Sequence, residues 1–239
     1  MSEKVHYFEL LPHEFRARMA QRPIGYLPLG TLEWHGEQCA LGSDALISHG
    51  LFQRAAQTLG GIVLPPIFLG PDRASPQSDG SVLQGMDTAD VTTPHRQLDG
   101  SCYWIPKGVF YQICESILAQ AVRTGFKCIV ADGHGPSRSA WGEQAGEWEI
   151  RFNLKLVSVA RDLRSQWQSQ TDHAAKNETS LMMALRPDLV DLSQLDQDRA
   201  VWPQGVGGED PRDSSVDHGE ACLKTSLEAL RVHLEQIGI

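Results

Sequence analysis

The sequence of 239 residues has only five cysteines, and no two of them are spaced as a Cys-x-x-Cys pair. An odd number of scattered cysteines provides neither a disulfide framework nor a cysteine-type zinc site. The sequence also lacks a run of about 20 apolar residues that would cross a bilayer, and its N-terminal stretch carries charges where a secretory signal needs an apolar core. These absences predict a protein of the reduced cytoplasm.

Clusters of positive charge are absent as well. Lys and Arg total 21 against 30 Asp and Glu, so the formal net charge is −9. Nucleic acids and anionic membranes are bound by concentrated positive charge, so neither is expected as a partner. Hydrophobic residues make up 41% and charged residues 21% of the chain, which is typical of a globular protein with a sizeable core.

Two common catalytic signatures are also missing. The sequence contains no Gly-x-Ser-x-Gly nucleophile motif and no Gly-x-x-x-x-Gly-Lys-Ser/Thr phosphate-binding loop. The chemistry must therefore be sought in other residues.

Short apolar runs alternate with amphipathic segments along the chain. The patterns predict strands at 24–29, 62–64, 128–131 and 154–159, and helices at 12–20, 45–59, 108–124, 139–149, 178–185 and 221–236. This alternation is typical of an α/β protein, with a mostly parallel sheet and helices on both faces. No repeat or linker interrupts it, so we expect one domain over residues 1–239. Residues 70–107 are rich in Gly, Pro, Asp and Ser, and predict a long functional or interfacial loop.

Polar clusters follow two of the predicted strands, at the sheet edge where parallel α/β proteins gather their chemistry. After 24–29 come Glu33 and His35, which point to the same side in extended backbone, and then Asp44. A carboxylate and an imidazole directed at one point suit a divalent metal. The alternative for Asp44 is a helix N-cap.

The second cluster surrounds His134, which stands between two glycines directly after strand 128–131. Glycines permit a sharp turn that exposes the imidazole, although a structural histidine is the simpler interpretation. The third cluster contains His173 and Glu178 near a helix start. They are either a metal ligand and an acid/base partner or ordinary surface and helix-terminal residues.

Taken together, three motifs resemble the creatininase (creatinine amidohydrolase) family. They read EWHGEQCALGSD from Glu33 to Asp44, DGHGPS from Asp132 to Ser137, and HAAKNETS from His173 to Ser180. Each motif alone is weakly specific, but the three occur in the family's order and with similar separations along most of the chain.

The resemblance implies a three-layer α/β/α sandwich with a metal centre of one or two Zn²⁺ or Mn²⁺ ions. By motif match, Glu33 and His134 would bind one ion, His35 the other, and Asp44 would bridge them. Pro136 stands where many members have a glutamate that completes the second site. We expect Glu178 to replace that glutamate, or else a single-ion site.

The same resemblance implies a hydrolase in which metal-activated water attacks a carbonyl of a small cyclic substrate, while His173, with Glu178, moves the proton. Amide cleavage is the first expectation. Polar residues of the 70–107 segment favour a second one, C–C bond hydrolysis of an oxidised inositol, with Ser101, Tyr103 and Trp104 as candidate substrate contacts. A third is a non-catalytic binding protein on the same scaffold. Family members form hexamers, so we expect a homo-oligomer.

Overall fold

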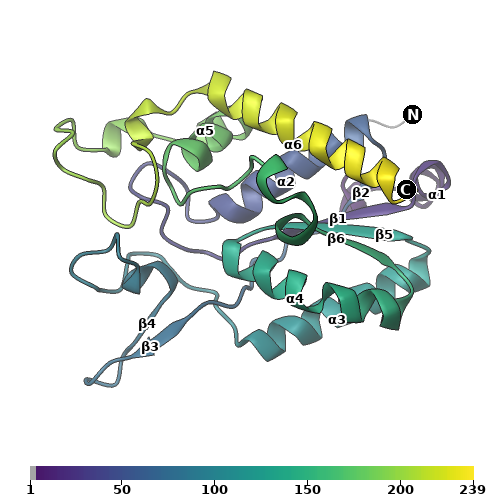
Figure 1. The fold of residues 1–239 in the computed structure, drawn as a ribbon, viewed down its shortest axis with the longest axis horizontal. Helices are drawn as coiled ribbons and strands as arrows, with labels where there is room; N and C mark the ends of the chain where they lie inside the picture. The colour runs from purple at the N-terminus through teal and green to yellow at the C-terminus, as the bar shows by residue number, and fades with distance from the viewer. Residues whose placement is uncertain (1–3) are drawn as a thin grey trace.

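The computed structural model describes residues 4–239 (Figure 1). Its helices are α1 (Pro12–Gln21), α2 (Ser43–Thr58), α3 (Lys107–Thr124), α4 (Gly135–Phe152), α5 (Lys176–Leu185) and α6 (Val216–Gln236). Its strands are β1 (Ile24–Leu29), β2 (Ile62–Val63), β3 (Ala74–Pro76), β4 (Val82–Gln84), β5 (Cys128–Gly133) and β6 (Lys155–Ser158). Among the described residues, no helix is long and apolar enough to cross a membrane.

The central sheet has the order β2-β1-β5-β6, and all of its neighbouring strands are parallel. Helices α2, α5 and α6 lie on one side of it, and α3 and α4 lie on the other (Figure 1). The predicted α/β/α sandwich with a mostly parallel sheet is therefore confirmed.

The strands are buried on both faces, so the period-two alternation of side chains separates two cores. Ile24 and Tyr26 of β1 belong to the core under α2, α5 and α6. Leu27 and Leu29 belong to the core under α3 and α4. This double burial explains why β1 reads as a continuous apolar run rather than as an alternating one.

The order of the strands determines where a site can form. The chain passes from β1 outward to β2 and later returns to the other side of β1 as β5. Connections leave β1 and β5 in opposite directions, which opens a crevice at their carboxyl ends. The Glu33 and His134 clusters follow these two strands directly.

The segment 70–107 is not the featureless loop that its composition predicts. It contains an antiparallel hairpin of β3 and β4, whose turn includes Asp79 and Gly80. An Asp-Gly pair is a known hairpin signal, but the flanking strands have three residues each and were too short to stand out. Figure 1 shows this hairpin projecting from the body of the molecule.

Candidate metal centre

The loop after β1 is fixed by hydrogen bonds that orient its two candidate ligands. The Glu33 amide donates to the Leu41 carbonyl at 3.0 Å, and the Trp34 amide donates to Ser101 Oγ at 2.8 Å. His35 Nδ1 lies 3.0 Å from the Glu33 carbonyl. Because a carbonyl only accepts, Nδ1 carries a proton, and Nε2 is the nitrogen that can bind a cation when its own proton is displaced.

His134 is oriented in a similar way. Its Nδ1 lies 2.8 Å from Ser137 Oγ, in the first turn of α4, which leaves Nε2 for other contacts. The preceding Gly133 has φ +142, and a Cβ there would lie 1.6 Å from the Leu29 carbonyl oxygen. Only glycine fits this close approach of the two strand ends, and the approach places His134 beside the β1 loop.

Asp44 and Glu178 meet His35 from the helices. Asp44 lies in the first turn of α2, whose N-cap is Gly42, so the N-cap interpretation of Asp44 is wrong. His35 Nε2 is 3.6 Å from Asp44 Oδ2 and 3.7 Å from Glu178 Oε2. The same Glu178 oxygen accepts a hydrogen bond from the Ala174 amide at 2.6 Å, which fixes the carboxylate.

Asp72 is a member of the cluster that the sequence interpretation missed. Its Oδ2 lies 3.4 Å from His134 Nε2, which is also 3.7 Å from Glu33 Oε2. Gly85, after β4, packs against this carboxylate, since a Cβ there would lie 2.7 Å from Asp72 Oδ2. The sequence offered little to identify Asp72 as a ligand. It is the first acidic residue after Gly70, and it belongs to no recognisable motif.

The ligand atoms of the cluster are close enough together to bind a divalent cation, and several of them have no hydrogen-bond partner among the described residues. Four buried ligand atoms have no hydrogen-bond partner within the described part of the chain: Glu33 Oε2, His35 Nε2, Asp44 Oδ2 and His134 Nε2. Three groups can hold an ion: Glu33, Asp72 and His134; His35, Asp44 and Glu178; and Glu33, His35 and His173. Ligands at ~2.1 Å from a tetrahedral Zn²⁺ are ~3.4 Å apart, close to the separations seen here.

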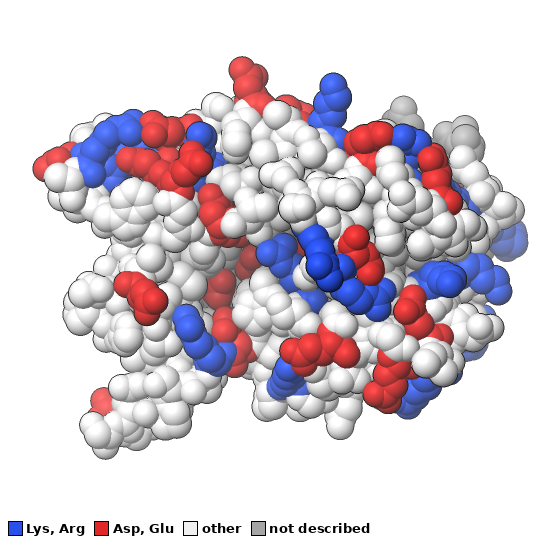
Figure 2. Space-filling view, viewed as in Figure 1, with Lys and Arg blue, Asp and Glu red and all other residues white. Residues whose placement is uncertain are grey.

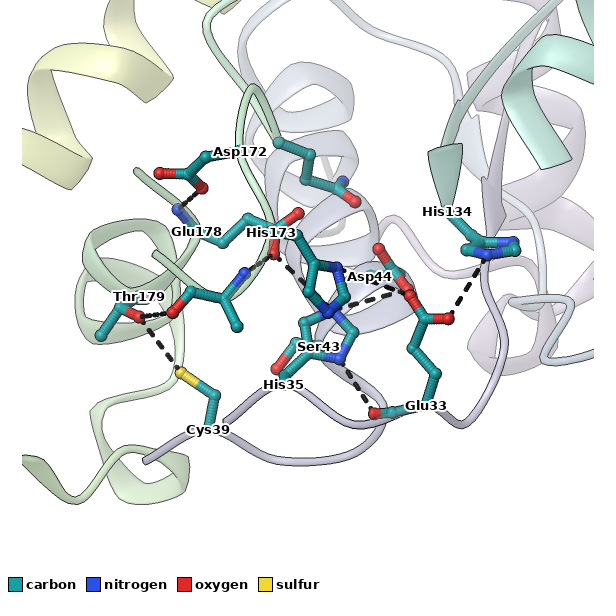
Figure 3. Close-up of polar contacts among 12 residues, drawn as sticks. Glu33, His35, Cys39, Ser43, Asp44, His134, Asp172, His173, Glu178 and Thr179 are labelled. Atoms are coloured by element: carbon teal, nitrogen blue, oxygen red, sulfur yellow. Dashed lines mark hydrogen bonds and ion pairs between the residues drawn. The ribbon is translucent and has the colours of Figure 1, made fainter. Parts of the chain in front are cut away.

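His173 lies beside these groups with a defined tautomer. Its Nε2 lies 2.8 Å from the Trp34 carbonyl and therefore donates to it, while Nδ1 lies 3.6 Å from Glu33 Oε1. Its ring also packs on His35, with centroids 4.6 Å apart. In Figure 3 these side chains converge from the β1 loop, α2 and the start of α5, with His134 facing them.

The pKa values of the clustered side chains reflect their burial and the several carboxylates that lie close together. Burial raises the pKa of Glu33 to about 7 and that of Glu178 to about 8. Burial alone would lower the pKa of His35, but the nearby carboxylates of Asp44, Glu178 and Glu33 outweigh it and raise that pKa to about 10. Burial, together with the charge of His35, lowers the pKa of His173 to about 3, so that imidazole is neutral.

The cluster, except for the fully buried His35, forms one wall of a cavity of about 330 Å³ that also borders Arg73, Arg138 and Gln170. Figure 2 shows acidic side chains within a hollow on this face and basic side chains at its margin. A cavity of this size suits a small molecule.

The proposed substrate contacts in the 70–107 segment lie elsewhere. Ser101, Tyr103 and Trp104 line a separate depression, and Ser101 is occupied in holding the Trp34 amide. The polar residues that suggested a polyol substrate, including Ser75, Asp79 and Arg96, are likewise not part of the cavity lining. Substrate binding by Ser101, Tyr103 and Trp104 stays a prediction, and only Asp72, Arg73, Gly85 and Met86 represent the segment in the cavity.

Comparison with known families agrees with the three motifs. The model of the creatininase family, described as creatinine amidohydrolase, matches residues 9–234. A creatinine amidohydrolase of Pseudomonas putida is 27% identical over 227 residues, which cover 85% of this chain and 80% of that protein.

Solved structures share the fold. A creatinine amidohydrolase (creatininase) crystal structure superposes with a TM-score of 0.75 at 22% identity, covering 99% of this chain and 98% of that one. The structure named "Creatininase Mn" gives 0.73 at 20% identity and covers 98% of both chains. A mutant creatininase of "Zn-Zn type" gives 0.74 at 20% identity and covers 99% of both.

Proposed function

The chain belongs to the creatininase family, and from this premise we propose that it is a metal-dependent amidohydrolase that opens a small cyclic amide. The main support is the convergence of four buried ligand atoms without hydrogen-bond partners in the described chain, on Glu33, His35, Asp44 and His134. Glu33, Asp44 and His134 line a small cavity, and His35 lies behind them against Asp44. Buried polar atoms are normally hydrogen-bonded, so their joint lack of partners among the described residues indicates a cation site.

The metal ligands fall into two groups in this proposal. Glu33, Asp72 and His134 would hold one divalent ion, and His35, Asp44 and Glu178 the other. Imidazole and carboxylate ligands suit both Zn²⁺ and Mn²⁺. Glu178 would supply the carboxylate that Pro136 does not, and Asp72 adds a ligand from the hairpin segment. When bound, such ions acidify a water molecule and polarise a carbonyl.

The protein's own contribution is to move a proton. His173 is neutral, and its Nε2–H is committed to the Trp34 carbonyl, so the Nδ1 lone pair is available beside Glu33. We propose that Nδ1 accepts the proton of the attacking water and returns it to the leaving nitrogen. The Trp34 carbonyl stabilises the imidazolium formed in between and fixes the ring's direction.

The test combines metal counting with assays. The purified chain should bind about two divalent ions, lose one of them in Glu33→Ala and the other in His35→Ala, and hydrolyse creatinine or another five-membered cyclic amide only when loaded. Exposed His13, in helix α1, gives the matched control, since His13→Ala should change neither property. A metal-loaded protein that is inactive on all cyclic amides would contradict catalysis and favour the binding-protein alternative.

C–C bond hydrolysis has no comparable support. That expectation depended on polar residues of the 70–107 segment, which lie outside the cavity lining. A cyclic diketone included in the same assay would reveal it directly.

A further inference from the structure

The cavity contains a second feature that metal binding does not explain. The side chain of Gln170 lines it and is only 3% exposed. Both its amide oxygen and its amide nitrogen are buried without a hydrogen-bond partner in the described residues. Exchanging the two atoms does not remove the problem, because an acceptor and a donor both remain unpaired.

The backbone that presents Gln170 is strained and firmly held. Its φ of 55 lies in the left-handed region, which non-glycine residues seldom adopt without a reason. Arg138 Nη2 donates to the Gln170 carbonyl at 2.8 Å. On the two sides, Asn177 accepts from the Thr171 amide at 3.0 Å and donates to the Gln168 carbonyl at 2.9 Å.

Arg138 is in turn anchored beneath the site. Its Nη1 lies 3.4 Å from Oδ1 of the buried Asp132, whose other oxygen accepts from Trp167 Nε1 at 2.8 Å. The aspartate therefore belongs to a chain of contacts that positions Gln170 rather than to the metal ligands.

We propose that Gln170 is a specificity-determining residue whose carboxamide pairs with a second amide edge of the substrate, which makes the substrate a cyclic ureide or imide. This rests on the proposed function. A carboxamide offers one donor and one acceptor side by side, and its complement is an N–H and a C=O on the same edge. Open-chain secondary amides are trans and present these groups on opposite sides, whereas small rings force them together.

The second edge follows from the geometry of the cavity. The carbonyl that is hydrolysed must face the metal ligands, so it cannot also pair with Gln170. A simple lactam has only one amide, so it can face the metal ligands or pair with Gln170, but not both. A ureide or imide ring has a further carbonyl and N–H, and can satisfy both at once.

The test is binding of two five-membered rings to the Zn²⁺-loaded protein by calorimetry. Hydantoin has additional amide edges, and 2-pyrrolidinone has a single amide. We expect hydantoin to bind the wild type about 10- to 100-fold more tightly, and Gln170→Met to remove most of this preference. Metal content and melting temperature of the variant should stay unchanged.

Gln170→Asn supplies the matched variant, because asparagine tolerates the left-handed backbone and keeps a shortened carboxamide. It should retain part of the preference for hydantoin. Equal affinity of the wild type for both rings, no binding of either, or an unchanged preference in Gln170→Met would overturn the proposal. Preferential binding without turnover would instead contradict the proposed function and leave the role of Gln170 intact.

Discussion

At the scale of single residues, three of the candidate ligands are oriented by hydrogen bonds within the protein. Backbone or hydroxyl contacts occupy Nδ1 of His35 and His134, and the Ala174 amide contacts Glu178. Such outer contacts fix ring direction and tautomer, and so prepare the site before a cation binds.

Asp72 gives the first prediction at this scale. If it binds the same ion as Glu33 and His134, Asp72→Ala should reduce the metal content from about two ions to about one per chain. Glu178→Ala should remove the other ion. Metal analysis of dialysed protein measures both, with exposed Asp99→Ala from the same segment as the control. A full complement in Asp72→Ala would show that this carboxylate is not a ligand.

The second prediction concerns His173. Replacing it with asparagine removes the proton carrier but no atom of the two principal ligand groups. We expect kcat to fall about 10²- to 10⁴-fold while the metal content is retained. Loss of metal together with activity would identify His173 as a ligand instead.

The third prediction concerns how stability and metal binding depend on pH. Burial raises the pKa values of Glu33 and Glu178 to about 7 and about 8, from 4.5. In the metal-free chain, the stability contributed by these protonated groups is complete below pH 4.5 and lost as the pH rises through 7 to 8. A metal ion competes with the same protons, so it binds more tightly as the pH rises.

The melting temperature of metal-loaded protein should therefore exceed that of chelator-treated protein by an amount that grows between about pH 6 and 8.5. Thermal unfolding at several pH values measures this difference. A difference that is constant, or that shrinks with rising pH, would contradict the assignment of these carboxylates as ligands.

At the scale of elements, the β3–β4 hairpin contributes to the centre through one glycine. Gly85 has φ +55, and a Cβ there would lie 2.7 Å from Asp72 Oδ2 and 3.3 Å from Glu33 Oε2. Gly80, in the turn of the same hairpin, has φ +86 and open space around it. Replacing either glycine with alanine imposes a similar backbone strain, because both have a positive φ. Only at Gly85 would the added methyl group also collide with neighbouring side chains.

Gly85→Ala should therefore displace the Asp72 carboxylate and reduce metal binding, whereas Gly80→Ala should cost only about 1 kcal/mol of stability. Metal content and the free energy of unfolding of both variants decide the matter. Equal metal loss in the two variants would mean that the hairpin acts through general stability and not through this contact.

At the scale of the whole molecule, the assembly state stays a prediction. The hairpin projects from the body (Figure 1) and has an exposed Val82, with the exposed Tyr103 in the same segment. Exposed apolar side chains on a projecting element favour contact with another copy of the chain. Sedimentation should give a multiple of the 26.4 kDa chain, and a monomer alone would reject the expectation.

The sequence by itself determined the elements of the body and predicted most of the side chains that the structure brings together as candidate ligands. Strand β1 and helix α1 match their predicted ranges within one residue, because buried strands and amphipathic helices leave period and composition signals. Helix α4 begins four residues earlier than predicted, at Gly135, since proline is compatible with a first helical turn. Glu33, His35, Asp44 and His134 were identified because they lie at strand ends or within short motifs.

Only the tertiary structure decided which distant residues join them. Asp72 reaches His134, and Gln170 reaches the same cavity, through the packing of the hairpin and of a strained turn against the sheet edge. Neither residue has a local pattern, because its role depends on contacts across 62 and 32 residues of chain, from Asp72 to His134 and from Arg138 to Gln170. Local sequence encodes backbone preference, whereas such convergence is produced by the fold as a whole.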